Sequence, residues 1–317
     1  MSTRPLSAPR TPAAAGRRRT RPAAEAGFRG VLSAADWAHE RTRRTMRLVL
    51  GALLGLLFLV GLGPMLWLAR AAVTPTQNTL REPLSLWSNP LDWANLYTAW
   101  ARFDIDLHMF NTVVIAAGAW LVQIVVATTA GYALSVLRPR YRKAVTGIVL
   151  ATLFVPSVVL LVPLYLTVLD PPLLGTSLVN SFWAVWLPAG ANAFNVLLVQ
   201  RFFDNLPREV FEAARMDGAG PFRLFWSVVL PMSKPILGVV SVFAVIASWK
   251  DFLWPMLVLP DPAVQPLSVR LPALRSFVEL DVFLSALALS SVIPIALFLM
   301  FQRTFLRGGG LGGAVKG

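Results

Sequence analysis

The stretch FEAARMDGAGPFRLFWSVVLP, residues Phe211 to Pro231, decides how this chain is expected to fold. It carries four charged side chains, two glycines and two prolines between long apolar runs. It is too polar to cross a bilayer, yet its apolar residues recur at the three- and four-residue spacing of a helix that packs one face. Gly218 stands where a first helix would end, and Pro221 suits the first turn of a second. The stretch therefore predicts a short helix, a glycine turn and another helix.

Both ends of this insert carry local signals. Asp204 or Asn205 is expected to cap the first helix, with Pro207 in its first turn. Leu230-Pro231 is expected to stop the second helix, because proline restricts the residue before it. Ser233 is then expected to cap the apolar helix that follows. The insert is thus predicted to be a compact platform between apolar helices.

The composition of the whole chain indicates a membrane protein. Its 317 residues are 56% hydrophobic and only 14% charged, with a mean hydropathy of +0.62. A soluble protein has about a quarter of its residues charged, so the excess apolar surface is expected to face lipid. The absence of cysteine excludes disulfides and thiol catalysis. Two histidines argue against a histidine-based metal centre, so no metal site is predicted.

Six segments approach or exceed the length of about 20 apolar residues that a membrane-spanning helix needs. They are residues 48–68, 109–137, 144–169, 171–200, 235–259 and 282–302. The fifth is the least regular, because Lys250 and Asp251 interrupt it. The predicted fold is therefore an all-α membrane protein with six transmembrane helices.

The basic residues predict the orientation in the membrane. Most of the 29 lysines and arginines fall in the segments that a cytoplasmic N-terminus would place inside. Both termini and the insert are therefore expected in the cytoplasm. The predicted regions are a disordered basic tail (1–47), a first membrane helix (48–70), an external segment (71–108), a transmembrane core (109–302) with its insert (204–231), and a C-terminal tail (303–317).

Two regions outside the core keep more than one interpretation. The GRRRTR run at Gly16–Arg21 suits anionic lipid or nucleic acid, but no aromatic residue is interleaved with it. It is therefore interpreted as part of a tail that fixes topology, and no nucleic-acid partner is expected. In the external segment, the aromatic residues suit an interfacial belt, short surface helices or a docking surface; they are Trp87, Trp93, Tyr97 and Trp100.

The spacing within the insert resembles the EAA signature of ABC-importer permeases. That signature is Glu-Ala-Ala, three residues, Gly, nine residues, Ile, one residue and Leu-Pro. This chain has Glu212-Ala213-Ala214, Gly218, Val228 in place of isoleucine, and Leu230-Pro231 at the same spacings. Other stretches are similar to the carbohydrate-uptake, maltose-importer-like group; they are Asn111-Thr112, Ala130–Leu134, Gln302-Arg303 and Gly313–Gly317. The resemblance covers roughly residues 105–317.

The resemblance implies that the insert is a coupling helix seated in a cleft of a separate ATPase subunit. Glu212 would meet a basic residue there, Ala213 and Ala214 would allow close packing, and Gly218 would set the angle between the short helices. Phe211, Arg215 and Asp217 complete the expected ATPase-coupling set. The glycine-rich tail from Gly308 is also expected to reach the ATPase.

The resemblance further implies a bacterial inner-membrane subunit with several partners. These are a second homologous permease, two ATPase subunits, an extracytoplasmic substrate-binding protein, membrane lipid and a small solute, expected to be a sugar. The chain itself is not expected to be an enzyme or to carry a cofactor. None of its lysines follows a glycine, so it lacks the Gly-Lys-Ser/Thr of a P-loop. ATP and magnesium would bind the partner ATPase.

Polar and aromatic residues within the apolar segments are candidates for the translocation path, since such groups in lipid usually face the protein interior. They are Gln123, Asn192, Asn195, Trp249, Asp251 and Trp254. Hydrogen bonds between helices remain an equal alternative for the asparagines, and an interfacial position for the tryptophans. Lys250 departs from the family's usual Trp-Asn-Glu-Phe. It is expected to neutralise a carboxylate, extend to the outer surface or favour an anionic solute such as a sugar phosphate.

Two other classes of protein are weaker interpretations. A free-standing secondary transporter or channel would need ionisable groups within its spans, and only Lys250 and Asp251 qualify. A membrane enzyme would need a catalytic group, and no Ser/His/Asp or paired-carboxylate arrangement stands out. No catalytic residue is therefore predicted.

Overall fold

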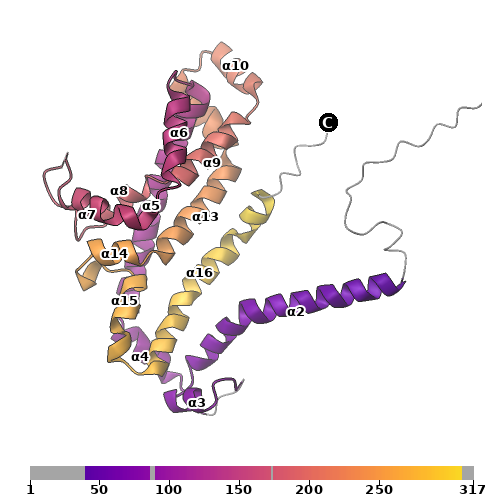
Figure 1. Ribbon diagram of the computed structural model, residues 1–317, viewed down its shortest axis with the longest axis vertical. Coiled ribbons are helices and arrows are strands. Elements are labelled where there is room, and N and C mark those ends of the chain that lie inside the picture. Colours follow the sequence, from indigo (N-terminus) through magenta and orange to yellow (C-terminus); the bar gives the residue numbers. More distant parts are fainter. Residues whose placement is uncertain (1–39, 86–89, 173, 309–317) are drawn as a thin grey trace, which may run out of the picture. The chain divides into compact units, whose positions relative to one another are not determined.

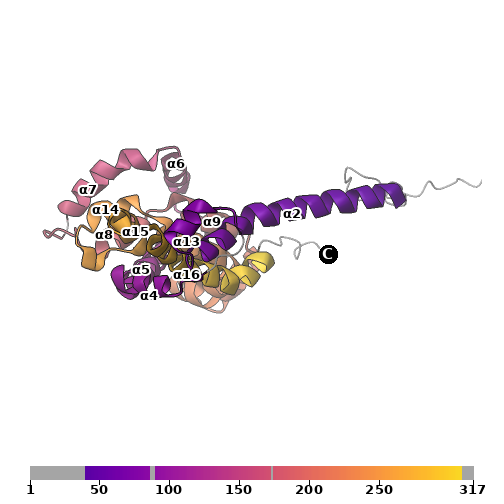
Figure 2. The same ribbon diagram turned by 90° about the horizontal axis from the view of Figure 1, so that it is seen from below.

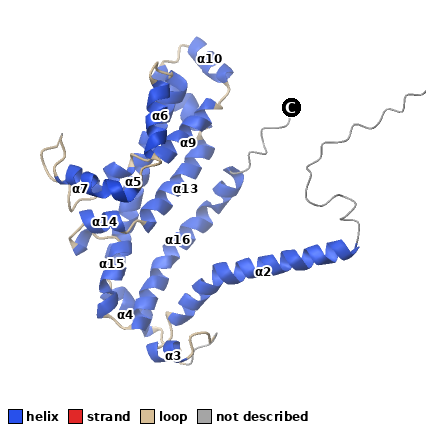
Figure 3. Ribbon diagram, viewed as in Figure 1, coloured by secondary structure: helices blue, strands red, loops and turns tan. Residues whose placement is uncertain are grey.

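The computed structural model describes residues 40–85, 90–172 and 174–308. In these residues every regular element is a helix and no strand is present, which confirms the all-α prediction (Figure 3). The predicted tails at 1–47 and 303–317 lie largely outside the described residues. The chain divides into two compact units, Met1–Leu62 and Gly63–Gly317.

Helix α2 (Glu40–Ala71) contains the first predicted span and begins before residue 48. The part of this helix from Arg44 to Ala71 is long enough and apolar enough to cross a membrane. Near its start, Arg44 donates to Glu40 at 3.2 Å, a pair that turns the charged side chains toward each other one helical turn apart. Beyond it the apolar side chains of the first unit are exposed, as expected of a helix whose partner is lipid.

Helix α5 (Ile105–Tyr132) is central to the second unit and follows two short helices, α3 (Thr76–Arg81) and α4 (Ala94–Arg102). It continues as a π-helical turn, η1 (Ala133–Leu137), and contacts helices on several sides. Small residues on its buried faces allow this close packing. A Cβ added to Gly118 would lie 2.1 Å from the Trp186 ring, so only glycine fits there.

The predicted span at 144–169 is not one straight helix. Helix α6 (Arg142–Thr152) is followed by η2 (Ser157–Leu160) and α7 (Leu161–Leu169), and the two parts meet at 100°. Pro156 lies at the break. Proline has no N–H to donate and disfavours the helical conformation of the residue before it, so the apolar run bends there.

The predicted span at 171–200 is also divided. Helix α8 (Trp183–Ala189) and helix α9 (Ala193–Asp204) are separated at Gly190–Asn192. The side chain of Asn192 caps α9, because its Oδ1 accepts the backbone N–H of Asn195 at 2.9 Å. An asparagine predicted as a polar group within a span therefore begins a helix instead.

The last part of the chain contains the fifth and sixth predicted spans. Its elements are α13 (Lys234–Lys250), α14 (Leu253–Val258), η4 (Pro262–Val264), α15 (Leu267–Leu274), η5 (Arg275–Phe277) and α16 (Leu280–Gly308). The fifth span is interrupted at Asp251, whose backbone is extended. Its carbonyl accepts the Ser268 hydroxyl at 2.7 Å, which holds the interruption against α15. Helices α8, α14 and α15 lie together in both views of the unit (Figures 1 and 2).

Length and composition alone qualify two helices of the described residues as spans, Arg44–Ala71 and Ile105–Leu137. Two bent pairs qualify only if each is taken as one span; they are Arg142–Thr152 with Ser157–Leu169, and Pro221–Met232 with Lys234–Lys250 at 78°. Leu280–Ala296 is a shorter apolar helix. The count of six spans stays a prediction.

Candidate functional site

The insert folds as four short elements, α10 (Arg208–Met216), α11 (Pro221–Leu224), the π-helical turn η3 (Phe225–Val229) and α12 (Leu230–Met232). Helix α10 lies at one end of the second unit and α4 at the other (Figure 1). Pro221 is the first residue of α11, as predicted, and the second helical run ends just beyond Pro231.

Two of the predicted caps are wrong. Asp204 is the last residue of α9, and Asn205 follows it, so neither caps α10; Pro207 holds that position. The Asp204 carboxylate instead accepts the Ser135 hydroxyl at 2.8 Å. Ser233 does precede α13, but its hydroxyl donates back to the Val229 carbonyl at 2.6 Å and caps nothing.

Gly218 forms the turn that the sequence predicts. Its φ is +78°, in the left-handed region that glycine enters without steric cost. The N–H of Ala219 donates to the Ala214 carbonyl at 2.9 Å, and the N–H of Gly218 to the Arg215 carbonyl at 3.0 Å. This pair of bonds is a Schellman motif, which closes the C-terminus of α10 and turns the chain toward α11.

One face of α10 is buried and the opposite face is open. Phe211 packs into a core cluster with Phe203, Leu224 and Phe225, and Ala214 packs against it. The remaining predicted coupling residues are exposed; they are Glu212, Ala213, Arg215, Asp217 and Gly218. Apolar side chains beside them are exposed as well, with Met216 at 89% and Phe222 at 76%.

Glu212 is available to a partner. The ion pairs among the described residues are Arg44–Glu40, Arg102–Glu279 and Arg138–Asp204, so Glu212 is not paired with the arginines of its own helix. A charged side chain beside exposed apolar groups on a helix with a buried anchor is typical of a docking surface.

A cleft of about 560 Å³ lies between α5, α13 and α16. Its walls are mostly apolar, with Trp120 from α5, Trp249 from α13 and Ile293 from α16 among them. Trp120 Nε1 donates to Ser241 Oγ at 2.7 Å, which joins α5 to α13 across the cleft. Trp120 and Ser241 were not predicted as site residues. The sequence offers one signal for each of them, which is a side chain with a hydrogen-bonding atom inside an apolar run.

The structure places the six candidate path residues differently from one another. Of these, Trp249 lines the cleft, beside Lys250. Gln123 and Asn195 are buried and bonded to each other, with Asn195 Nδ2 donating to Gln123 Oε1 at 2.7 Å. This is the contact between helices that the alternative interpretation expects, because it joins α5 to α9.

Trp254 and Asp251 are not among the residues that line the cleft. Trp254 is 8% exposed, packs in a cluster with Val185 and Val258, and donates from Nε1 to the Ala184 carbonyl at 3.0 Å. Asp251 lies at the break after α13, with its carboxylate 3.4 Å from the backbone nitrogen of Trp254. A role of either residue in translocation stays a prediction.

Lys250 is exposed at the end of α13 and contributes to the cleft wall. No Asp or Glu of the described residues forms an ion pair with it. Within the same described ranges, no group of three or more His, Cys, Asp or Glu side chains is placed to hold a metal ion. The cleft therefore combines two tryptophans with one basic side chain.

Relatives named as permease proteins of transport systems match most of the chain. The sn-glycerol-3-phosphate transport system permease protein UgpE of Yersinia enterocolitica is 29% identical over 251 residues, covering 75% of this chain and 86% of the relative. The melibiose/raffinose/stachyose import permease protein MelC of Bacillus subtilis is 30% identical over 240 residues, covering 74% and 85%. The diacetylchitobiose uptake system permease protein NgcG of Streptomyces coelicolor is 30% identical over 260 residues, covering 80% and 83%.

A solved structure shares the fold. It is that of a bacterial ABC transporter involved in the import of the acidic polysaccharide alginate, with a TM-score of 0.73 and 21% sequence identity, covering 84% of this chain and 98% of that chain. Residues 123–308, which include the insert and most of the cleft wall, match a single family. The chain belongs to the family of binding-protein-dependent transport system inner membrane components.

Proposed function

We propose that this inner-membrane component is the permease subunit of an ATP-driven importer, and that the insert couples it to a separate ATPase. The observation that carries this proposal is the two-sided α10. Phe211 anchors the helix in the protein core, while Glu212, Ala213 and Arg215 stay exposed and Glu212 is unpaired among the described residues. A rigid, anchored helix with an open face suits the transfer of motion from one subunit to another.

The remaining subunits of the assembly are part of the same proposal. The sequence contains no Gly-Lys-Ser/Thr motif, so ATP and magnesium are proposed to bind a separate pair of ATPase subunits. The proposed assembly also contains a second homologous permease and an extracytoplasmic substrate-binding protein. The proposed topology has six spans, counting each bent pair as one, with both termini and the insert in the cytoplasm.

The test reverses the charge of Glu212 in one variant and the charge of a neighbour on the same helix in another. Glu209 and Glu212 are both exposed on α10, but only Glu212 belongs to the expected coupling set. Glu212→Lys should weaken co-purification of the ATPase with the permease, because a basic partner would then meet a like charge. Glu209→Lys is the matched control and should retain the ATPase. Uptake that survives loss of the ATPase would refute an ATP-driven importer and favour a secondary transporter.

The solute is proposed to be a sugar, since MelC and NgcG are named as permeases for sugar uptake. Two tryptophans at the cleft, Trp120 and Trp249, suit the apolar faces of sugar rings passing between α5 and α13. Binding assays of the partner binding protein with neutral sugars, polyols and sugar phosphates would identify the class of solute.

One observation favours an anionic solute as a second candidate. Lys250 lines an otherwise mostly apolar cleft and has no ion pair among the described residues, and UgpE is named for the transport of a phosphate ester. Lys250→Gln should then lower uptake of a phosphorylated solute about tenfold, as expected for loss of a charge-assisted hydrogen bond of roughly 1.5 kcal/mol. Uptake of a neutral sugar by the same variant is the control. Equal uptake of the phosphorylated solute by wild type and Lys250→Gln would exclude this role of Lys250.

A further inference from the structure

The end of α5 is hydrogen-bonded to the C-terminal side of the insert. The Tyr132 hydroxyl donates to the backbone carbonyl of Pro221, the first residue of α11, at 2.7 Å. The ring is 7% exposed, and its centroid lies 5.0 Å from that of Phe225. Because packing holds the ring, the hydroxyl is aimed at this carbonyl. The start of α11 is therefore fixed to the last residue of α5.

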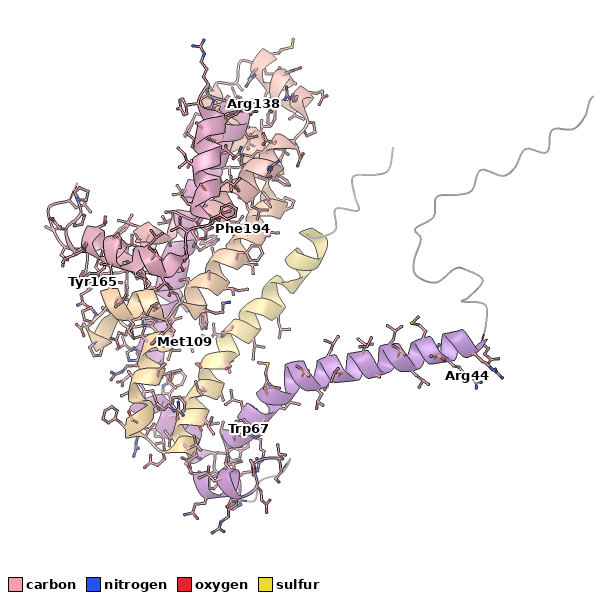
Figure 4. The ribbon with its side chains drawn as sticks, in the orientation of Figure 1. Arg44, Trp67, Met109, Arg138, Tyr165 and Phe194 are labelled. Atoms are coloured by element: carbon pink, nitrogen blue, oxygen red, sulfur yellow. The ribbon has the colours of Figure 1, made fainter. Side chains whose placement is uncertain are left out.

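The π-helical turn after α5 is bonded to the N-terminal side of the insert. Ser135 Oγ donates to Asp204 Oδ1 at 2.8 Å, and Arg138 Nη2 lies 3.9 Å from the same oxygen. Arg138 has a φ of +51°, a left-handed conformation that residues with a Cβ seldom adopt. Its Nε donates to the Ser135 carbonyl at 2.7 Å, which holds the arginine in place. Arg138 lies at the same end of the unit as α10 (Figure 4).

These two attachments enclose the whole of α10 and its glycine turn, residues 205–220. The anchor of α10, Phe211, belongs to the same buried cluster as Tyr132 and Leu134. The residues that flank the enclosed segment are therefore bonded to the stretch 132–138, and Phe211 in its middle shares a buried cluster with that stretch. An insert that transmits movement must be firmly attached to the membrane helices, since a loosely attached insert would move without displacing them.

We infer that Tyr132, Ser135 and Asp204 are positioning residues that transmit movement of the insert to α5. This inference rests on the proposed function. Helix α5 contains no proline, so its hydrogen bonding is continuous from the insert to the cleft. Trp120 of α5 reaches the cleft and donates to Ser241. Displacement of Tyr132 would therefore change the cleft wall directly.

The far end of α5 is attached as well. Three of its side chains bind the backbone of residues 263–267, the connection between α14 and α15. His108 Nδ1 lies 2.8 Å from the Gln265 carbonyl oxygen. Asn111 Nδ2 donates to the Ala263 carbonyl at 2.8 Å, and Thr112 Oγ1 accepts from the Leu267 N–H at 3.0 Å. One helix thus joins the insert, the cleft and the connection at the opposite end of the unit.

The first experiment removes one hydroxyl. Tyr132→Phe keeps the ring against Phe225 and deletes only the bond to Pro221. In the complete transporter reconstituted in vesicles, the amount of solute imported per ATP hydrolysed should fall about fivefold, the effect expected of one buried hydrogen bond of average strength. Tyr141→Phe is the matched control, because the Tyr141 side chain is 67% exposed. It should leave the ratio unchanged.

A second pair of variants tests the other attachment. Asp204→Ala removes the acceptor of the Ser135 hydroxyl and should lower the same ratio. Asp204→Asn keeps an acceptor oxygen and should restore most of it, because the Arg138–Asp204 pair is partly exposed and contributes little. Thermal unfolding and co-purification of the ATPase are measured for each variant. A purely structural role would change these two readouts and leave the ratio intact.

The outcomes separate this inference from the proposed function. If Tyr132→Phe and Asp204→Ala both import as much solute per ATP as the wild type, the inference is overturned. In that case, co-purification of the ATPase that depends on Glu212 would still support the importer. Loss of solute per ATP with normal assembly would support the inference. An assembly that contains no ATPase would overturn the proposed function itself.

Discussion

Gly218 offers the sharpest test of the insert's geometry. Its φ of +78° is disfavoured for every residue that carries a Cβ, and more so for a β-branched one. A Cβ at this position would meet nothing within 4 Å, so the backbone conformation is the expected source of the cost. The penalty of Gly218→Val is therefore that of the left-handed backbone, about 1–2 kcal/mol. It lowers the population of the native turn, relative to relaxed conformations, by a factor of roughly 5–30.

Gly220 provides a matched control two residues away. Its backbone is extended, with φ −69° and ψ 169°, and a Cβ there also meets nothing within 4 Å. Valine favours this region, so Gly220→Val changes the same number of atoms without the left-handed cost. Any effect seen in Gly218→Val alone then comes from the turn.

The assay is solute uptake and ATP hydrolysis by the reconstituted transporter. Gly218→Val is expected to insert in the membrane, because the substitution lies outside every apolar segment, and to hydrolyse ATP with several-fold less uptake per ATP. Gly220→Val is expected to couple as the wild type does. Normal coupling in Gly218→Val would show that the Schellman turn does not set the orientation of α10. An equal defect in both variants would attribute the effect to added bulk.

Two further predictions concern packing around α5. Gly118→Ala should destabilise the purified assembly by about 1–3 kcal/mol, because the new methyl group meets the Trp186 ring. Gly147→Ala is the control and should leave stability unchanged, because a Cβ there meets nothing within 4 Å. Thermal unfolding of the two variants measures the difference. The Gln123–Asn195 bond should give a coupling energy of about 0.5–2 kcal/mol in a double-mutant cycle with leucine at both sites, and additive effects would show that the bond contributes no stability.

Features set by neighbouring residues were predictable from the sequence. Gly218 and Pro221 act through their own backbone preferences, and both stand where those preferences placed them. Asp204 has an equally strong local preference for a cap, yet it bonds to Ser135, which is 69 residues away along the chain. A cap depends on which donor the carboxylate meets in three dimensions, and local sequence does not contain that information.

The apolar segments illustrate a second limit. Composition predicts how much of the chain prefers lipid, but the continuity of a helix depends on single residues. Pro156 bends the segment at 144–169 by 100°, and Asn192 divides the segment at 171–200 by starting a new helix. Both residues are visible in the sequence. Proline and asparagine inside membrane helices are tolerated when neighbouring groups satisfy the freed backbone, so their presence alone does not reveal a break.

Polar residues in apolar segments become informative once their partners are known. Gln123 and Asn195 are hydrogen-bonded to each other across α5 and α9, as the interhelical interpretation expects, and a role of either in translocation stays a prediction. Lys250 has no such partner among the described residues and lines the cleft. A lysine in a mostly apolar wall needs water, lipid or a solute to supply the missing polar contacts. Lys250, one of the positions at which this sequence differs from the motifs it resembles, is therefore the residue proposed to contact a solute, and its substitution should separate solutes by charge.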